Sequence, residues 1–171
     1  MDRRTVDSDE LDALRRCGLT MSRTRGTLFH GRGNVAEDLA ATDWRNLSRV
    51  ATADRYFEQT ILPEVASRTS NPEEAEMLAR ASLATTAAFL GAGNCGAHAE
   101  LATHFHASSL RPGTERVYVQ SRAYADGSTH EWAEMSGGPA GRVIMDAWSK
   151  GPPVLAEDSV FSSDFQPHSG G

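Results

Sequence analysis

The sequence predicts an α+β protein, and three features of its hydrophobic pattern point to that class. From residue 34 to residue 90, apolar side chains recur at steps of three and four residues, which indicates amphipathic helices. A further helical pattern begins at Cys95. Beyond residue 116 the period changes to two, which is typical of half-buried strands. Helices followed by consecutive strands favour helices packed on an antiparallel sheet.

Length and charge limit the class of protein further. The 171 residues suit a single domain with its own hydrophobic core. A formal net charge of −6 argues against a general nucleic-acid binder, which would usually be basic. No apolar run approaches the roughly 18 residues that a membrane-spanning helix needs. We therefore expect neither nucleic acid nor a membrane span.

Residues 1–33 are rich in Arg, Ser, Thr and Asp and contain few large apolar side chains. This composition predicts a flexible leader, with at most a short helix around residues 11–19. The first ten residues contain no apolar h-region, so we expect no Sec signal peptide. Composition leaves two readings open: a disordered leader, or a segment recognised by a specialised secretion system or its chaperone.

Two helical stretches are expected between residues 34 and 90. The first begins with Asn34 as the N-cap, breaks near Thr42-Asp43, and is kinked or restarted at Pro63. The second begins at Asn71-Pro72, because a capping residue, a proline at the first position and acids in the first turn all favour a helix start. It should end at Gly91.

The second half of the chain predicts one more helix and three strands. The helix that starts at Cys95 should reach about Ser108. Residues 117–122 and 130–135 alternate as strands do, and the turn at residues 125–128 makes a hairpin of them. The apolar run over residues 142–147 is expected as the third strand. We therefore expect one folded domain over residues 34–163 and a loose tail over residues 164–171.

Cys95 is the first candidate for chemistry. It follows a glycine-rich turn and begins a helix, where unpaired N–H groups and the positive end of the helix dipole favour a thiolate. The dipole contributes about 0.3–1 kcal/mol, whereas one pKa unit corresponds to about 1.4 kcal/mol. The helix end alone cannot activate the thiol, so a nearby imidazolium is needed. The alternative is a structural thiol buried on a packed helix.

His130 and Asp146 are the expected partners of Cys95. His130 begins the second predicted strand, and Asp146 lies within an apolar run on the third. A buried acid is costly unless it is paired, and a histidine ring would pair with it. Asp146 would then accept a proton from the second ring nitrogen and orient the ring. The alternative for both residues is a surface position on a strand.

Five further residues are candidates for the oxyanion hole or the wall of the site: Asn94, Gly96, Gln120, Trp132 and Trp148. The N–H of Cys95, assisted by Gly96, would stabilise an oxyanion, with Asn94 or Gln120 as the second donor. Each tryptophan lies two residues from His130 or Asp146, on the same strand face. They would shield the imidazole from water or belong to the core.

A metal site is not expected. Cys95 and His98 share a helical face, but His104 and His106 do not share one, so four ligands would not converge. We also expect no cofactor and no disulfide between Cys17 and Cys95. His98 remains an alternative to His130 as the base.

The segment Gly93-Asn94-Cys95-Gly96-Ala97-His98-Ala99, followed by His130 and then Asp146-Ala147-Trp148, resembles the papain-like Cys-His-Asp family of bacterial toxins and effectors. It is similar to the deamidase domain of Pasteurella multocida toxin and to related type III effectors. The resemblance covers about residues 80–150. It implies a papain-like fold with Cys95 as nucleophile, His130 as general base and Asp146 as the orienting acid.

The same resemblance implies a thiol hydrolase that is secreted into a host cell and acts on a host protein. Members of the family include glutamine deamidases, proteases and transglutaminases, which share a thioester intermediate. We expect glutamine deamidation first and proteolysis next. Two other classes stay open: a catalytically inert module that binds a host protein, and a transferase acting on small molecules.

Overall fold

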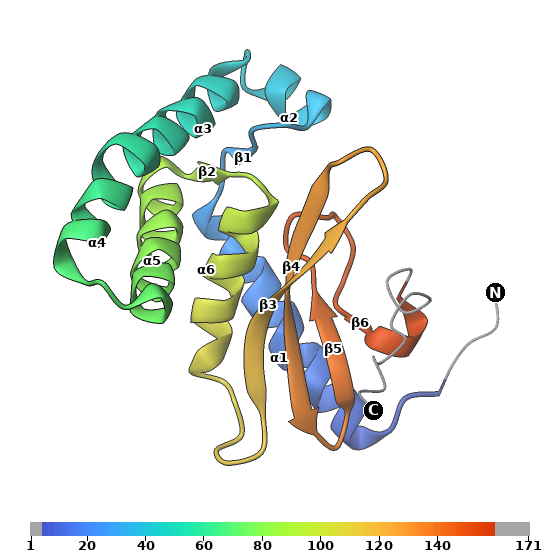
Figure 1. Cartoon of the computed structure of the whole chain (residues 1–171). Coiled ribbons are helices and arrows are strands. Elements are labelled where there is room, and N and C mark those ends of the chain that lie inside the picture. The colour runs from blue at the N-terminus through green and yellow to red at the C-terminus, as the bar shows by residue number, and fades with distance from the viewer. Residues whose placement is uncertain (1–4, 160–171) are drawn as a thin grey trace.

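The computed structural model of the chain describes residues 5–159 (Figure 1). The helices come first, interrupted by two short strands, and the longer strands follow the last α-helix. The strands β3 (Arg116–Ala123), β4 (Thr129–Gly138), β5 (Gly141–Met145) and β6 (Val154–Leu155) form an antiparallel sheet in that order. The main helices are α1 (Ser8–Thr27), α2 (Ala36–Ala41), α3 (Arg45–Tyr56), α4 (Leu62–Arg68), α5 (Pro72–Leu90) and α6 (Cys95–Ala107). The predicted α+β class is confirmed.

Helices α1 and α6 pack together on one face of the sheet (Figure 1). The core between them is built from small and sulfur-containing side chains of α1 and α6 and from the inward residues of β4 and β5: Ala13, Cys17, Met21, Ala102, Ala133, Met135, Val143 and Met145. A short parallel pair, β1 (Gly31–Arg32) with β2 (Ala92–Gly93), brings the end of α1 beside the start of α6. This pair and β6 were not predicted, because two-residue strands carry no periodic signal.

The predicted flexible leader over residues 1–33 is wrong for most of its length. Asp7 and Glu10 form a capping box at the start of α1, in which Asp7 Oδ1 accepts from the Glu10 N–H at 2.9 Å. The buried face of α1 has helical spacing but consists of one methionine and otherwise small or hydroxyl-bearing side chains: Ala13, Cys17, Thr20, Met21 and Thr24. The composition of residues 1–33 therefore wrongly indicated disorder, whereas the helical spacing of these buried residues indicates a helix. The folded domain begins before residue 34.

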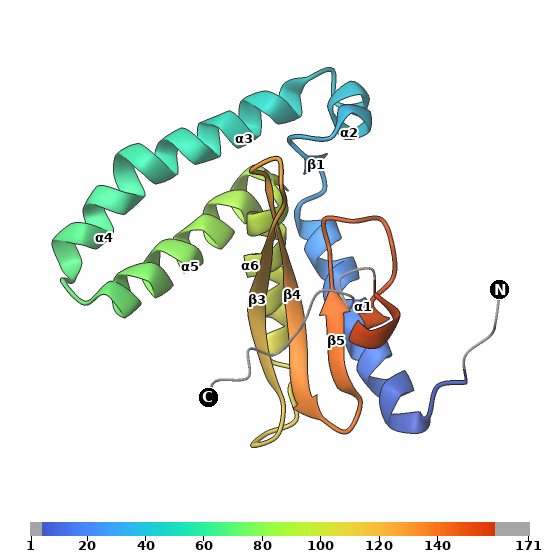
Figure 2. The same ribbon diagram turned by 45° about the vertical axis from the view of Figure 1, so that its right-hand side comes forward.

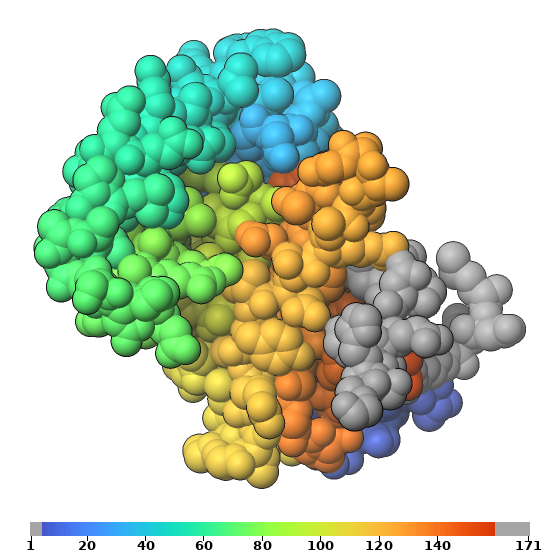
Figure 3. Space-filling view, viewed as in Figure 1, coloured from blue at the N-terminus to red at the C-terminus, as the bar shows by residue number. Residues whose placement is uncertain are grey.

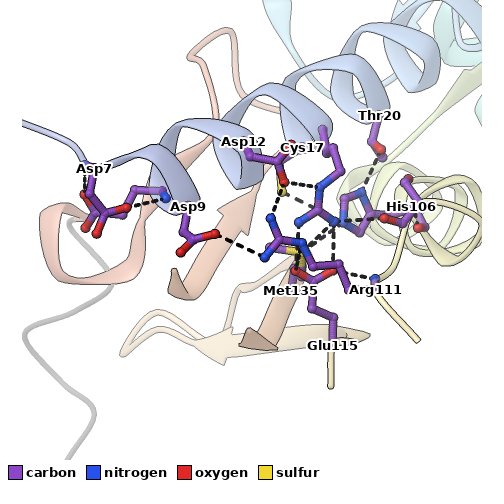
Figure 4. Close-up of polar contacts among 12 residues, drawn as sticks. Asp7, Asp9, Asp12, Cys17, Thr20, His106, Arg111, Glu115 and Met135 are labelled. Carbon is purple, nitrogen blue, oxygen red and sulfur yellow. Dashed lines mark hydrogen bonds and ion pairs between the residues drawn. The ribbon is translucent and has the colours of Figure 1, made fainter. Parts of the chain in front are cut away.

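Charged side chains hold α1 against the loop before the sheet, as Figure 4 shows. Arg16 forks onto Glu115, with Nη2 2.7 Å from Oε1 and Nη1 2.8 Å from Oε2. Arg111 donates to Asp9 at 3.2 Å and to Asp12 at 3.0 Å. The Glu115 side chain is 1% exposed, so the pair with Arg16 satisfies a carboxylate that would otherwise be costly to bury.

Helices α3, α4 and α5 form an arm that stands away from the sheet (Figure 2). A π-helical turn over Phe57–Ile61 joins α3 to α4 just before Pro63, where the sequence predicts a kink or restart. The predicted start of α5 is confirmed, since Asn71 Oδ1 accepts from the Glu73 N–H at 3.0 Å. Its predicted end is also confirmed, since Gly91 has a φ of 66°.

The predicted cap at Asn34 is wrong, whereas the predicted break near Thr42-Asp43 is confirmed. Val35 precedes α2, and the side chain of Asn34 instead accepts a hydrogen bond from Trp148. After α2, Asp43 and Trp44 take positive φ values of 48° and 64°, which ends the helical run. Among residues 5–159, no helix is both long and apolar enough for a bilayer crossing. The predicted loose tail, residues 164–171, lies outside the described residues.

Candidate active site

Cys95 is the first residue of α6, as the sequence predicts, and local chemistry fixes the start of that helix. Asn94 is the N-cap, and its Oδ1 accepts from the Ala97 N–H at 3.1 Å. There is no room for a side chain at Gly93, because a Cβ there would lie 2.6 Å from Cβ of Ala97. Cys95 thus stands at the positive end of the α6 dipole, in a half-buried position.

The structure brings Cys95, His130 and Asp146 together. His130 Nε2 lies 2.7 Å from Asp146 Oδ2, and the ring also hydrogen-bonds the thiol of Cys95. Because Nε2 faces the aspartate, Nδ1 is the nitrogen left for the sulfur. Ala133 pairs with Met145, so Asp146 follows the last paired residue of β5 and reaches His130 diagonally.

The protonation of this group favours a charged pair. The hydrogen bond that His130 donates to Asp146, then its hydrogen bond with Cys95, raises the pKa of His130 to about 9, against the opposing effect of burial. Burial raises the pKa of the Cys95 thiol, but the hydrogen bond from His130 and those from the N–H groups of Glu131 and Gly96 bring the pKa below its ordinary value. Together these shifts favour a thiolate facing an imidazolium.

The turn that follows Asp146 is held by α1. Arg25 Nε donates to the carbonyl of Ala147 at 3.1 Å, and Nη2 donates to the carbonyls of Ser149 at 2.6 Å and Gly151 at 2.7 Å. The N–H of Ser149 in turn donates to Asp146 Oδ1 at 3.1 Å. Sequence reasoning missed Arg25 because it lies in the segment predicted to be a leader. Its helical spacing from Met21 was the only available signal.

Trp132 and Trp148 flank the imidazole. The ring of His130 is 5.9 Å from that of Trp132 and 5.1 Å from that of Trp148, centroid to centroid. Trp132 is buried, and the indole N–H of Trp148 donates to Asn34 Oδ1 at 3.3 Å. Arg32 lies over the Trp148 ring at 5.4 Å. Both tryptophans therefore form walls around His130, which limits the access of water to its bond with the aspartate.

The candidate oxyanion donors occupy different positions. The side-chain oxygen of Asn94 caps α6, and the N–H of Gly96 donates to the Cys95 sulfur. The N–H of Cys95 itself opens the helix, where no intrahelical acceptor exists for it. Gln120 lies opposite Trp132 in β3, and no hydrogen bond to the three central residues is formed by Gln120 within residues 5–159. A second donor is not evident among these residues.

His98 is not placed to act as the base. It is buried, and its Nδ1 donates to the carbonyl of Asn94 at 2.8 Å. Burial lowers the pKa of His98, so its ring stays neutral at neutral pH. Neither cysteine is in a disulfide. Within the part of the chain that the structure describes, no cluster of three or more His, Cys, Asp or Glu residues could hold a metal ion.

The start of α6 faces the space between the helical arm and the β3–β4 hairpin, and its atoms are visible there in Figure 3. A cysteine at a helix N-terminus, opposed by a histidine and an acid from adjacent strands, can perform nucleophilic attack on a carbonyl carbon. Comparison with known proteins identifies no relative: no protein-family model, curated protein or solved structure matches the chain.

Proposed function

We propose that the chain is a cysteine hydrolase of papain-like fold, and that it deamidates a glutamine of a host protein. The observation that carries the proposal is the hydrogen-bonded series Cys95, His130 and Asp146 at the start of α6. The arrangement of a cysteine-bearing helix against an antiparallel sheet with the histidine and the acid supports the papain-like fold. The choice of glutamine as substrate follows the family resemblance.

The first half of the reaction is the attack of the Cys95 thiolate on the carboxamide carbon. The developing oxyanion is stabilised by the N–H groups at the start of α6. The carbon–nitrogen bond then breaks, and the proton that His130 carries passes to the leaving nitrogen, which departs as ammonia. Asp146 stabilises the imidazolium and orients the ring throughout. A thioester on Cys95 remains.

The second half is hydrolysis of that thioester. Neutral His130 takes a proton from a water molecule, whose oxygen attacks the thioester carbon. The carbon–sulfur bond breaks, the thiolate is restored, and the product is a glutamate side chain. A protease of the same fold would release a peptide amine in the first half, and a transglutaminase would use an amine in place of water in the second half.

Delivery into the cytoplasm of a host cell by a specialised secretion system, with a chaperone as partner, is part of this proposal. It rests on the same resemblance. Because α1 belongs to the folded core, a secretion signal within residues 8–27 would have to be read before the chain folds. Export of the protein with residues 8–27 replaced by an unrelated helix-forming sequence would test that point.

The mass of candidate host proteins after incubation with the chain tests the reaction itself. A gain of about one dalton means deamidation, a cut chain means proteolysis, and addition of an amine means transglutamination. The Cys95→Ala variant is the matched control. Unchanged masses, together with a Cys95 that iodoacetamide alkylates no faster than an ordinary thiol at about pH 6, would leave the inert binding module as the better account.

A further inference from the structure

Glu131 places a carboxylate beside the proposed nucleophile, and the reaction described above does not use it. The N–H of Glu131 donates to the sulfur of Cys95. Its side chain turns to α6, where Oε2 would lie 2.6 Å, and Cδ 3.7 Å, from a Cβ placed on Gly96. Since Cys95 and Gly96 are the first two residues of α6, the carboxylate lies at the positive end of that helix.

The glycine at position 96 is explained by this contact. Gly96 is not one of the glycines with a positive φ, so its backbone conformation is open to other residues. A Cβ at this position would lie 2.6 Å from Glu131 Oε2, so the Glu131 side chain would have to move away. Gly96 therefore gives Glu131 the space to approach the start of the helix.

Glu131 and Glu100 are both acids near the start of α6, and within the described residues only Glu100 is neutralised by an ion pair. Glu100 lies one turn along α6 from Gly96 and forms an ion pair with Arg80 of α5. Among residues 5–159, no arginine or lysine forms an ion pair with Glu131. The imidazole of His130 already has Asp146 and the thiol as partners. The side of Cys95 that meets Gly96 is thus negative.

We infer that Glu131 selects the acyl group that reaches Cys95, favouring a neutral carboxamide and repelling a carboxylate. This inference rests on the proposed function, for which it names the substrate class. A carboxamide N–H₂ can donate a hydrogen bond to Glu131, whereas a carboxylate can only accept. The glutamate formed by deamidation would be repelled by the same side chain, which favours release of the product. Glu131 therefore acts as a specificity-determining residue that contacts the substrate.

Two alkylating reagents that differ only in this group test the inference. Iodoacetamide carries a carboxamide and iodoacetate a carboxylate. Their rates at Cys95 are compared by peptide mass mapping at about pH 9.5, where a thiol with an ordinary pKa of about 8.5 is mostly ionised. The quantity of interest is the ratio of the iodoacetamide rate to the iodoacetate rate, which cancels differences in thiol reactivity.

Glu131→Gln should lower that ratio roughly three- to tenfold, since removal of one nearby charge relieves the repulsion of iodoacetate. Gly96→Ala should lower it less, because the added methyl group displaces the carboxylate without removing its charge. Glu58→Gln, on the exposed π-helical turn of the arm, removes the same charge far from Cys95 and should leave the ratio unchanged. An identical ratio in the wild-type and Glu131→Gln proteins would overturn the inference.

Failure of the proposed function would show itself separately. That result is a Cys95 of ordinary reactivity at about pH 6 with no mass change in any candidate substrate. The ratio at high pH needs no activated thiol, so the effect of Glu131→Gln on it is measured in either case. Circular dichroism of each variant verifies that the compared proteins are folded, and Gly96→Ala provides the test if Glu131→Gln is not.

Discussion

The chain contains two cysteines that each lie beside a histidine, and only one of these pairs is suited to chemistry. Cys95 and His130 meet at the start of α6. Cys17 and His106 meet inside the core, with Sγ 4.0 Å from Nε2 (Figure 4). The same two residue types thus occur in two surroundings within one fold.

The protonation of the two pairs is opposite. Burial raises the pKa of Cys17 to about 12, and burial together with the charge of Arg16 lowers the pKa of His106 to about 4. Both are therefore neutral at neutral pH. At the other pair, the pKa of His130 rises to about 9 and the pKa of Cys95 falls. The Cys17–His106 pair is a packing contact, whereas the Cys95–His130 pair favours separated charges.

The third residue and the helix end account for the difference. His130 has the carboxylate of Asp146 at 2.7 Å, whereas His106 has the neutral hydroxyl of Thr20 at 2.8 Å and the sulfur of Met135 at 3.2 Å. Cys95 stands at the positive end of α6, and His106 lies in its last turn. A cysteine near a histidine is therefore not enough to identify a nucleophile. A carboxylate and access to solvent are needed as well.

The largest expected effect is the loss of the nucleophile. If Cys95 is the proposed nucleophile, Cys95→Ala should reduce turnover about a million-fold, as removal of the nucleophile does in serine hydrolases, and should leave the fold intact. Cys17→Ala is the matched control in the other pair. It should retain turnover and lose about 1–2 kcal/mol of unfolding free energy, since a buried sulfur is removed. Turnover by purified Cys95→Ala would refute the assignment of the nucleophile.

Removing the carboxylate should make the Cys95–His130 pair resemble the Cys17–His106 pair. Asp146→Asn should lower the turnover rate by about 10³–10⁴, because the asparagine does not stabilise the imidazolium, while some residual activity remains. Alkylation of Cys95 at about pH 6 should slow with it. Thr20→Val, which removes the hydroxyl from His106, should leave both rates unchanged. Equal rates in wild type and Asp146→Asn would contradict the role of Asp146.

The support of the Asp146 turn by α1 should matter less than the acid itself. Arg25→Gln removes three hydrogen bonds to backbone carbonyls and should lower turnover about 10–100-fold, because small misplacements of a reacting group carry a cost of this size. Arg23→Gln is the control on the same helix, where Arg23 stacks over the ring of Phe105. If both variants retain full turnover at equal stability, Arg25 does not position the site.

The smallest effect is on the pH dependence of unfolding, where the two histidines act in opposite directions. The folded pKa of His130 lies above its ordinary value of 6.5, so its stabilisation is complete below pH 6.5 and is lost as pH rises through about 9. The folded pKa of His106 lies below 6.5, so its contribution is complete above pH 6.5 and is lost as pH falls through about 4. Urea unfolding between these limits measures both.

Two variants separate those contributions. In Asp146→Asn the loss of unfolding free energy at alkaline pH should be smaller than in wild type, whereas the loss at acid pH should be unchanged. In His106→Gln the acid loss should shrink, and the alkaline loss stays. If the unfolding free energy falls equally steeply with pH above 6.5 in wild type and Asp146→Asn, the aspartate does not hold the proton on His130.

Much of the fold could be predicted from local pattern. The cap at Asn71, the glycine at position 91 and the thiol at the start of α6 are local features, since each depends on the few residues around it. The alternation that marks β3 and β4, and the apolar run that marks β5, are local in the same sense. These signals also led to Cys95, His130 and Asp146 as candidates, because each stands at a recognisable point of its element.

The order of α1 could not be predicted from composition. Its buried face is lined by alanine, cysteine and threonine side chains and a single methionine, so residues 1–33 contain few of the large apolar residues that mark a core in the composition. What makes the helix stable is its contact with α6 and the sheet, and the ion pair between Arg16 and Glu115 joins residues far apart in the chain. Arg25 and the turn after Asp146 were missed for the same reason.

Sequence alone determined helix α6, strands β3, β4 and β5, and the residue types available for the site, because capping and periodicity depend on neighbours in the chain. Tertiary structure decided which histidine meets which cysteine, since His106 and His130 both lie downstream of both thiols. It decided that Glu131 lies against Gly96, and that α1 supports the turn of Asp146. Protonation follows from burial and from charges brought close by folding, and neither quantity can be read from positions along the chain.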